Sequence, residues 1–482
     1  MAGRQALIAA AIGVLAGLGP SVPAADAPQI RSFAGAEAAP SVRWVLPVGT
    51  VDSEEDEVDG ISVDPEGNTI ISGVFRNAIT WGEERRQQSA GAGDIFIASL
   101  SPTGSVRWVQ RVGAGGDDNS YDLTTDGAGN IYISGWFSET VRFGDVTLRS
   151  RGDTDMFVVK LAPDGSTRWA RAFGGPMRDG GNEIAVLDNG EVAVAALTAG
   201  DFTIDGKTYA HGGGQRDSLL LRLAPDGTLR WVARFNGPGN ERLRAVAMNP
   251  AGEVFLGFQF RGVMRFGALS FTSRGDWDGA LLKLDAAGKL LWGRQVGGAG
   301  TDNVRGVGAG PDGSVYAAGV LTGAAAVIDR SVPARGRRGN DYVARVSPSG
   351  SVEWLVTIDG DGRGVGTELQ ADARGVIVSG ILRGRASVRR DGETLLTLGP
   401  PAGRATSLLT ALSADGRLRF VFTPHPGGGG AGALGDVLSV SRDGRFLAQS
   451  LLFRGRLRVA EQEVRTPSRM DSVVVFLTLN GA

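Results

Sequence analysis

Short runs of apolar residues alternate along most of the chain with turns that are rich in glycine, aspartate and proline. Typical runs are DIFIASL at 94–100, DMFVVKL at 155–161 and DGALLKL at 278–284, followed by the turns SPTG, APDG and DAAG. Runs of about four to eight such residues between turns are typical of antiparallel strands. The turn residues fit this interpretation, because proline fixes φ and glycine accepts the positive φ of tight turns.

The strand pattern repeats with a period of about sixty residues, and an aromatic residue marks each repeat. Successive markers lie 61 to 66 residues apart. The markers are Trp44, Trp108, Trp169, Trp231, Trp292 and Trp354, with Phe420 in the seventh copy. Each repeat contains four strand-like runs. A fixed period of this length predicts a repeat architecture in which neighbouring units bury each other's apolar faces.

We therefore predict an all-β fold, a seven-bladed β-propeller of four-stranded antiparallel blades. A β-helix fits less well, because its coils are shorter and stack in parallel register. The ring closes most economically if residues 41–48 form the outer strand of the last blade. Blade one then covers residues 59–112, and blade seven combines 436–479 with 41–48.

The amino terminus has the pattern of a secretory signal peptide. Arg4 precedes an apolar run at 6–19, and small residues follow at cleavage-site spacing. Ala27 is an alternative cleavage position, and an uncleaved anchor is the competing interpretation. The expected parts are a signal peptide at 1–24, a linker at 25–40 and the propeller at 41–482. We expect export to the periplasm, the cell surface or the medium, with no membrane span in the mature chain.

Composition excludes several classes of function. The chain of 482 residues contains 75 glycines, which argues against a helical protein because glycine is a poor helix former. It has no cysteine and only two histidines, His211 and His425, so thiolate sites and histidine-rich metal sites are excluded. The formal net charge of −2 gives no field that would recruit nucleic acid. The nucleophile motif GxSxG and the zinc motif HExxH are absent.

One repeat carries a recognisable signature. GNIYISG at 129–135, RFG at 142–144 and DMFVVKLAPDGSTRW at 155–169 together resemble the bacterial SBBP-type β-propeller repeat. The resemblance extends over nearly all of 41–482. It implies a propeller in an exported or surface-associated bacterial protein, and it implies no reaction.

The residues that recur in every repeat are expected to be structural. The tryptophan markers should fill the same gap between blades each time. An aspartate that opens the third strand should accept backbone N–H bonds and fix the loop before it. These aspartates are Asp94, Asp155, Asp217, Asp278, Asp341 and Asp471, and Thr406 replaces the aspartate in the sixth copy. Trp136 and Trp277 lie outside the marker position and are either core residues or sugar-stacking platforms.

The loops that lead from each tryptophan strand into the next blade differ from one another, which suits a binding site. They should surround one mouth of the central channel, acidic on one side and basic on the other. The candidate ligand-binding residues are Asp59, Asp122, Glu183, Arg244, Arg305 and Glu368. Such a mouth would hold a polar ligand or a cation. The alternative is a solvated rim.

These observations predict a non-catalytic binding or scaffold module for an unidentified protein, or a glycan, at the cell envelope. One alternative is a glycan hydrolase or lyase that uses carboxylates and arginines at the channel mouth. Another is a quinone enzyme, because LDAAGKLLW at 284–292 is similar to the tryptophan-docking motif of pyrroloquinoline-quinone proteins. We expect no cofactor, no catalytic residue and no metal ligand. Calcium at the acidic run 52–59 is the open alternative, although that run lacks DxDxDG spacing.

Overall fold

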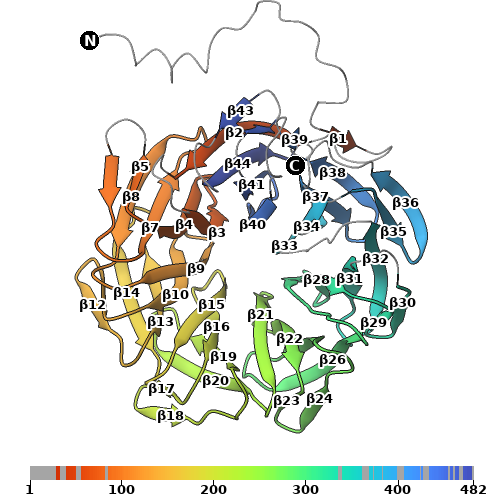
Figure 1. Ribbon diagram of the computed structural model, residues 1–482, viewed down its shortest axis with the longest axis horizontal. Coiled ribbons are helices and arrows are strands. Elements are labelled where there is room, and N and C mark those ends of the chain that lie inside the picture. The colour runs from red at the N-terminus through yellow and green to blue at the C-terminus, as the bar shows by residue number, and fades with distance from the viewer. Residues whose placement is uncertain are drawn as a thin grey trace, which may run out of the picture.

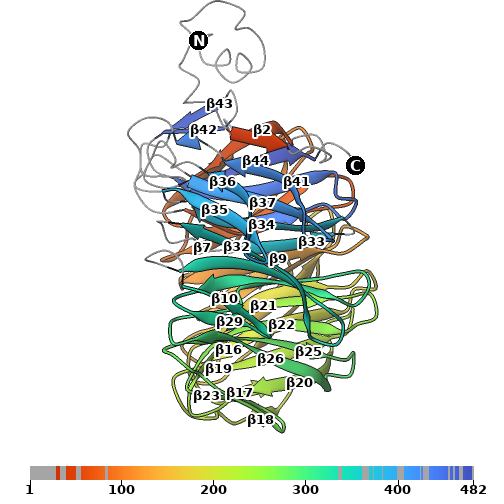
Figure 2. The same cartoon turned by 90° about the vertical axis from the view of Figure 1, so that its right-hand side faces the viewer.

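The computed structural model describes most of the chain. The described residues are 29–32, 40–49, 56–81, 85–334, 339–360, 368–372, 374–382, 384–398, 406–423, 425–426, 434–453, 456–459, 462–465 and 471–479. Within these residues, every regular element of secondary structure is a β-strand. Seven antiparallel blades, each built on four strands, surround a central channel (Figure 1), as the sequence predicts; β1 (Gln29–Ser32) and two hairpins extend three of the sheets. Figure 2 shows the resulting disc from its side.

Each blade runs from an inner strand outward. Blade one contains β3 (Glu57–Val63), β4 (Thr69–Phe75), β7 (Asp94–Leu100) and β8 (Val106–Val112). Blade two contains β9 (Asp118–Thr125), β10 (Ile131–Phe137), β13 (Asp155–Leu161) and β14 (Thr167–Phe173). Blade three contains β15 (Asp179–Val186), β16 (Val192–Thr198), β19 (Asp217–Leu223) and β20 (Leu229–Phe235). Blade four contains β21 (Asn240–Met248), β22 (Val254–Arg261), β25 (Asp278–Leu284) and β26 (Leu290–Gly298).

The remaining blades follow the same order. Blade five contains β27 (Gly306–Ala309), β28 (Val315–Leu321), β31 (Asn340–Val346) and β32 (Val352–Gly360). Blade six contains β33 (Glu368–Asp372), β34 (Gly375–Leu382), β37 (Thr406–Ser413) and β38 (Leu418–Thr423). Blade seven contains β40 (Leu434–Val440), β41 (Phe446–Phe453), β44 (Asp471–Thr478) and β2 (Ser41–Val48).

A small hairpin follows the second strand of each blade and accounts for the variable arm of the repeat. The hairpins are β5 (Ala78–Trp81) with β6 (Arg85–Gln88), β11 (Thr140–Phe143) with β12 (Val146–Arg149), β17 (Phe202–Ile204) with β18 (Lys207–Tyr209), β23 (Val263–Phe266) with β24 (Leu269–Thr272), β29 (Ala325–Val327) with β30 (Arg330–Val332), β35 (Ala386–Arg390) with β36 (Glu393–Leu398), and β42 (Arg456–Val459) with β43 (Gln462–Arg465). A two-residue strand, β39 (His425–Pro426), pairs with β42.

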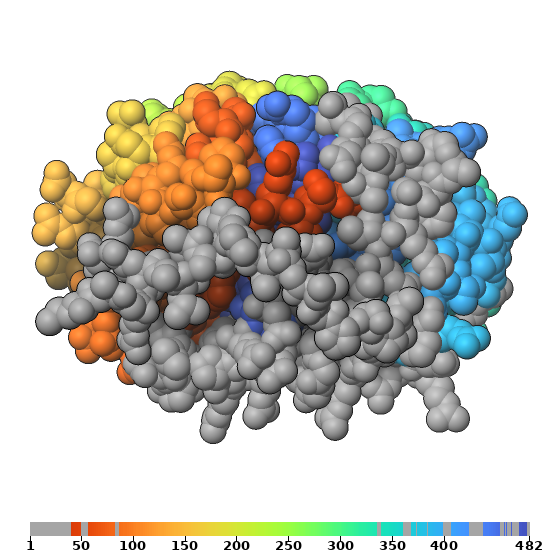
Figure 3. Space-filling model, turned by 90° about the horizontal axis from the view of Figure 1, so that it is seen from above, coloured from red at the N-terminus to blue at the C-terminus, as the bar shows by residue number. Residues whose placement is uncertain are grey.

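The ring closes as predicted, with β2 as the outer strand of blade seven. β2 pairs antiparallel with β44, in a register that runs from Ser41 opposite Thr478 to Val48 opposite Ser472. The Trp44 ring stacks on Phe476 with 5.0 Å between centroids. Figure 3 shows this junction from outside, where red N-terminal atoms lie against blue C-terminal atoms.

The structure adds one strand that the sequence analysis did not anticipate. β1 (Gln29–Ser32) lies in the segment expected to be a linker and pairs with β38 at the outer edge of blade six. The signal peptide predicted at 1–24 lies outside the described residues.

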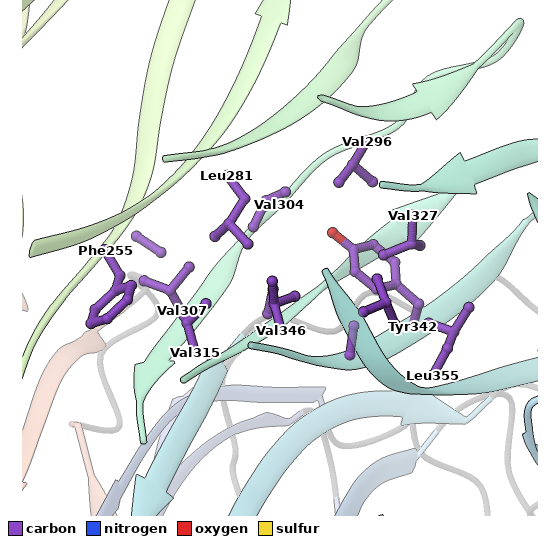
Figure 4. Packing of buried hydrophobic residues seen from close by; sticks show 14 of the residues in the cluster. Phe255, Leu281, Val296, Val304, Val307, Val315, Val327, Tyr342, Val346 and Leu355 are labelled. Carbon is purple, nitrogen blue, oxygen red and sulfur yellow. The ribbon is translucent and has the colours of Figure 1, made fainter. Parts of the chain in front are cut away.

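The core lies between blades rather than within them. One cluster joins Phe255 and Leu281 of blade four to Val307, Tyr342 and Val346 of blade five (Figure 4). Burying one such side chain contributes about 1.5–3 kcal/mol. Each blade therefore depends on both neighbours for the burial of its faces.

The tryptophan markers join neighbouring blades, as expected. Each indole Nε1–H donates to the carbonyl of a residue in the third turn of the next blade, at 2.8–3.2 Å. The glycine of that turn packs on the ring: a Cβ atom at Gly227, which has φ +82°, would lie 2.9 Å from Trp169. Trp292 makes the same bond, to Pro348 O. Blade packing thus accounts for the tryptophan of the quinone-like motif.

The recurring aspartates fix the loops before their strands, which confirms the structural interpretation in four blades. Asp94 accepts a bond from Ala90 N at 3.0 Å, and Asp155 accepts one from Arg151 N at 3.1 Å. Asp217 and Asp278 bind Gly212 N at 2.6 Å and Arg274 N at 3.2 Å. A buried carboxylate at this position satisfies loop N–H groups that would otherwise lack a partner.

Candidate functional site

The first strands of the blades line the central channel, and their side chains form a cavity at its mouth, here called the mouth cavity. Its volume is about 390 Å³. The cavity is lined by Glu57, Asp59, Asn119, Tyr121, Asp122, Asn182, Glu183, Arg244, Arg305, Glu368, Val437 and Leu452. All six residues chosen from the sequence, Asp59, Asp122, Glu183, Arg244, Arg305 and Glu368, therefore face one space. That they bind a ligand stays a prediction.

The sequence analysis left some lining residues out of its site. Tyr121 and Asn182 occupy the same strand position as Asp59, so the alignment of repeats already contained the signal for them. Asn119 lies two residues before Tyr121 on β9. Leu452 comes from the end of β41, and no repeated position indicated it.

Asp122 and Glu183 form the acidic wall. The Asp122 carboxylate accepts bonds from Leu123 N at 2.7 Å and from Ile184 N of blade three at 2.8 Å, so it is held between two blades. Burial nevertheless raises the pKa of Asp122 to about 7. Burial, and then the neighbouring carboxylates Asp122 and Glu368, raise the pKa of Glu183 well above its usual value.

Arg244 and Arg305 form the basic wall. Burial, together with the like charges of Arg305 and Arg242, lowers the pKa of Arg244 to about 10, so it stays cationic at neutral pH. One guanidinium nitrogen of Arg244 lies 3.5 Å from Gln259 Oε1. The Arg242 guanidinium lies 4.8 Å from the centroid of the Trp277 ring. That face of Trp277 is therefore occupied by an arginine.

The acidic and the basic side chains line the same cavity without pairing. Among the residues that the structure describes, no ion pair within 4 Å joins Glu183 to Arg244 or Arg305, although all three line the mouth cavity. Partly buried polar and charged groups without partners cost free energy. A ligand with groups of both signs, or with hydroxyls and an anion, would recover part of that cost.

A smaller cavity of about 80 Å³ adjoins the mouth cavity. The two cavities share Asp122, Glu183, Arg305 and Glu368, and the lining of the smaller one also includes residues such as Leu369. The charged groups thus line both cavities.

Metal binding finds no support in the described part of the chain. No group of three or more histidine, aspartate or glutamate side chains there is placed to hold a metal ion. In the acidic run 52–59, residues 52–55 lie outside the described residues, whereas Glu57 and Asp59 line the mouth cavity. His211 lies on a loop with its Nε2 3.8 Å from Asp217 and does not line that cavity.

Comparison with family models identifies one repeat directly. Residues 107–136 match the model described as SBBP, beta-propeller repeat. This stretch includes part of the signature on which the sequence resemblance rests.

Several solved structures align with the chain at low scores. The structure of the Dos1 propeller aligns with a TM-score of 0.44 at 12% identity, covering 91% of this chain and 96% of that one. The Neurospora crassa Pan2 WD40 domain aligns at 0.42 and 11%, covering 89% and 90%. XC5397 from Xanthomonas campestris, described as a gluconolactonase, aligns at 0.37 and 11%, covering 95% and 98%. At these scores the likenesses say nothing about what this chain binds.

No curated protein matches the chain. Within the described residues, no helix has the length and apolar character needed to cross a membrane.

Proposed function

Because the chain contains an SBBP-type β-propeller repeat on a seven-bladed ring, we propose that it is an exported, non-catalytic binding module whose ligand occupies the mouth cavity. The partner is a group on a protein or a glycan of the cell envelope. The observation that carries this proposal is that Glu183, Arg244 and Arg305 line one cavity without an ion pair among them.

The chemistry of the walls defines what the ligand must offer. Arg244 and Arg305 are donors only, so they suit a carboxylate or another oxyanion. Asp122, Glu183 and Asn182 suit hydroxyl, amine or amide donors on the ligand. A volume of about 390 Å³ lies within the range of small-molecule sites, which is roughly 300–1,000 Å³. One or two sugar rings or a short peptide segment would fill it.

Export is the second part of the proposal. It rests on Arg4, the apolar run at 6–19 and the small residues that follow. Fractionation of cells that produce the chain would test it: we expect a processed form outside the cytoplasm. An unprocessed chain that remains in the cytoplasm would contradict this part alone.

A capture experiment tests the binding function. Immobilised wild-type chain and an Arg244→Ala/Arg305→Ala variant would be incubated with envelope extract, and bound proteins and glycans would be compared. Arg142→Ala is the matched control, because Arg142 is two-thirds exposed on β11, pairs with the exposed Asp145 and donates to Gly144 O of the same hairpin. We expect a ligand that wild type and control retain and the double variant loses. Identical retention by all three would refute the site.

One observation favours a second candidate, a glycan hydrolase or lyase. Asp122, with its pKa near 7, shares a cavity with Glu183, and a carboxyl that is protonated near neutral pH serves as a general acid. Hydrolase and lyase substrates should be screened with wild type, Asp122→Asn and Glu183→Gln. Turnover that both variants lose would replace the binding proposal by this one.

A further inference from the structure

A second cavity adjoins the mouth cavity between blades two and three. It has a volume of about 210 Å³ and is here called the Trp136 cavity. Its lining includes Trp136, Thr154, Arg178, Gly180 and Arg216. It shares Tyr121 and Asn182 with the mouth cavity, so the two cavities adjoin at these residues.

The Trp136 cavity arises from two departures from the repeat. In blade two, Trp136 on the second strand lies opposite Asn119 on the first strand. The equivalent pairs in blades one, three and four are Val74 opposite Glu57, Leu197 opposite Gly180, and Gln259 opposite Arg242. Blade two thus has an aromatic ring where these blades have smaller or aliphatic side chains. Blade three has a glycine where its neighbours have a polar side chain.

Gly180 leaves the indole open to the cavity. A Cβ atom built at Gly180 would lie 3.5 Å from Trp136 Cβ and 3.7 Å from Trp136 Cδ1, which is ordinary contact distance. The φ of Gly180 lies outside the left-handed region, so its backbone accepts any side chain. The half-buried Trp136 is therefore accessible because no side chain fills this position.

Arginine side chains line the Trp136 cavity as well as the mouth cavity. Among the described residues, Arg178 forms an ion pair with Asp153 alone, at 3.8 Å and with both side chains about two-thirds exposed, which is a weak interaction. Arg216 makes no ion pair with any residue in the described ranges. After burial, its positive charge is the next cause that lowers the pKa of Arg242. The two arginines beside Trp136 are thus available to an anion, as Arg244 and Arg305 are in the mouth cavity.

We propose that the two cavities together bind an acidic oligosaccharide. One sugar ring packs its C–H face on Trp136, with its carboxylate at Arg178 and Arg216. The next sugar ring occupies the mouth cavity, with its carboxylate at Arg244 and Arg305 and its hydroxyls at Asp122 and Glu183. This inference rests on the proposed function of the mouth cavity and names its ligand class.

The lining favours a sugar chain over a peptide. A peptide segment usually anchors through apolar side chains in apolar pockets. Apart from Trp136 and Tyr121, the two linings offer few apolar side chains, Leu197, Val437 and Leu452 among them, whereas acceptors and arginines are numerous. Tyr121 is 44% exposed at the junction and offers a second ring along the same path.

Calorimetry with defined probes tests this inference. The probes are uronate tetramers of three kinds (oligogalacturonate, oligomannuronate and hyaluronan tetrasaccharide), the single sugar galacturonate, neutral cellotetraose and a tetraglutamate peptide. The variants are Gly180→Leu, which fills the Trp136 cavity, Trp136→Leu, which places the leucine of blade three at this position, Arg244→Ala/Arg305→Ala, and the control Arg142→Ala.

We expect at least one uronate tetramer to bind, with cellotetraose and the peptide bound much more weakly. Gly180→Leu and Trp136→Leu should each weaken tetramer binding about tenfold, which corresponds to about 1.4 kcal/mol. They should leave the binding of galacturonate unchanged, because a single sugar needs only the mouth cavity. The double arginine variant should lose both probes, and the control should lose neither.

Each negative result would contradict a different part of the proposal. Tetramer binding that neither Gly180→Leu nor Trp136→Leu changes would overturn the Trp136 cavity and leave the mouth cavity standing. Equal binding of cellotetraose, or tighter binding of the peptide, would overturn the acidic glycan. If no uronate binds while the chain still retains an envelope ligand through its arginines, the ligand class is wrong and the proposed function survives.

Discussion

At the scale of single residues, the closure of the ring explains why the seventh marker is a phenylalanine, Phe420, and not a tryptophan. Each tryptophan donates to a turn between the third and fourth strands of the next blade. Phe420 faces blade seven, where β44 and β2 are the third and fourth strands and no turn connects them. Among the described residues, no turn carbonyl lies there to accept an indole N–H, and the phenylalanine fills the gap with an apolar ring alone.

This reading predicts unequal effects of exchanging the two aromatic residues. Trp108→Phe removes the bond to Pro163 O, 3.1 Å long, and should lower the free energy of unfolding by about 1 kcal/mol. Phe420→Trp should give no gain and should destabilise through overpacking, because Phe420 is 1% exposed. Urea unfolding measures both changes. A stabilising Phe420→Trp would show that the position does have an acceptor.

Much of the candidate site could be predicted from single residues. Because the repeats align and each first strand faces the channel, six residues could be predicted to lie at one mouth: Asp59, Asp122, Glu183, Arg244, Arg305 and Glu368. The sequence analysis named Trp136 as either a core residue or a stacking platform, but the cavity beside it could not be predicted. That cavity depends on Gly180 of blade three lying against Trp136 of blade two, and the sequence does not show which side chains of neighbouring blades lie together.

At the scale of elements, β2 and β1 make different contributions to the blades that they join. β2 supplies the fourth strand of blade seven and buries Trp44 and Val48, whereas β1 adds four residues to the outer edge of a blade that is already complete. The first was predictable because its sequence is a copy of the repeat. The second was not, because QIRS has no apolar alternation and its pairing depends on an open edge at β38.

Truncation should separate these two contributions. A chain that begins at residue 50 lacks both strands, exposes the edge of β44, and should unfold at a markedly lower temperature with a tendency to associate. A chain that begins at residue 40 lacks only β1 and should retain most of the stability. Thermal unfolding and size-exclusion chromatography compare the two with the full chain. Equal stability of both truncated chains would show that β2 does not hold the ring closed.

At the scale of the whole molecule, buried carboxylates come together at successive blade junctions. Asp118, Asp179, Glu241 and Asp302 lie beside the loop-fixing aspartates Asp94, Asp155, Asp217 and Asp278 of the preceding blade. The sequence showed only one aspartate per repeat, because the second carboxylate belongs to the variable loop region of the next blade. Burial first, and then the neighbouring carboxylate, raises the pKa of Asp179 to about 7 and that of Glu241 to about 8.

These junctions should make stability fall as the pH rises. A carboxyl whose pKa is raised on folding contributes its full stability below the unfolded pKa, about 4.3 for glutamate, and loses it as the pH passes the folded pKa. For Glu241 the window runs from about 4.3 to about 8, with a slope of about 1.4 kcal/mol per pH unit. Glu241→Gln cannot ionise, so it should match wild type near pH 4 and exceed it in unfolding temperature at pH 8. Calorimetric scans from pH 4 to 8.5 measure the difference, with Asp145→Asn as a control because Asp145 is fully exposed. Parallel curves for wild type and Glu241→Gln would mean that the charge at this blade junction is stabilised by a partner other than a proton.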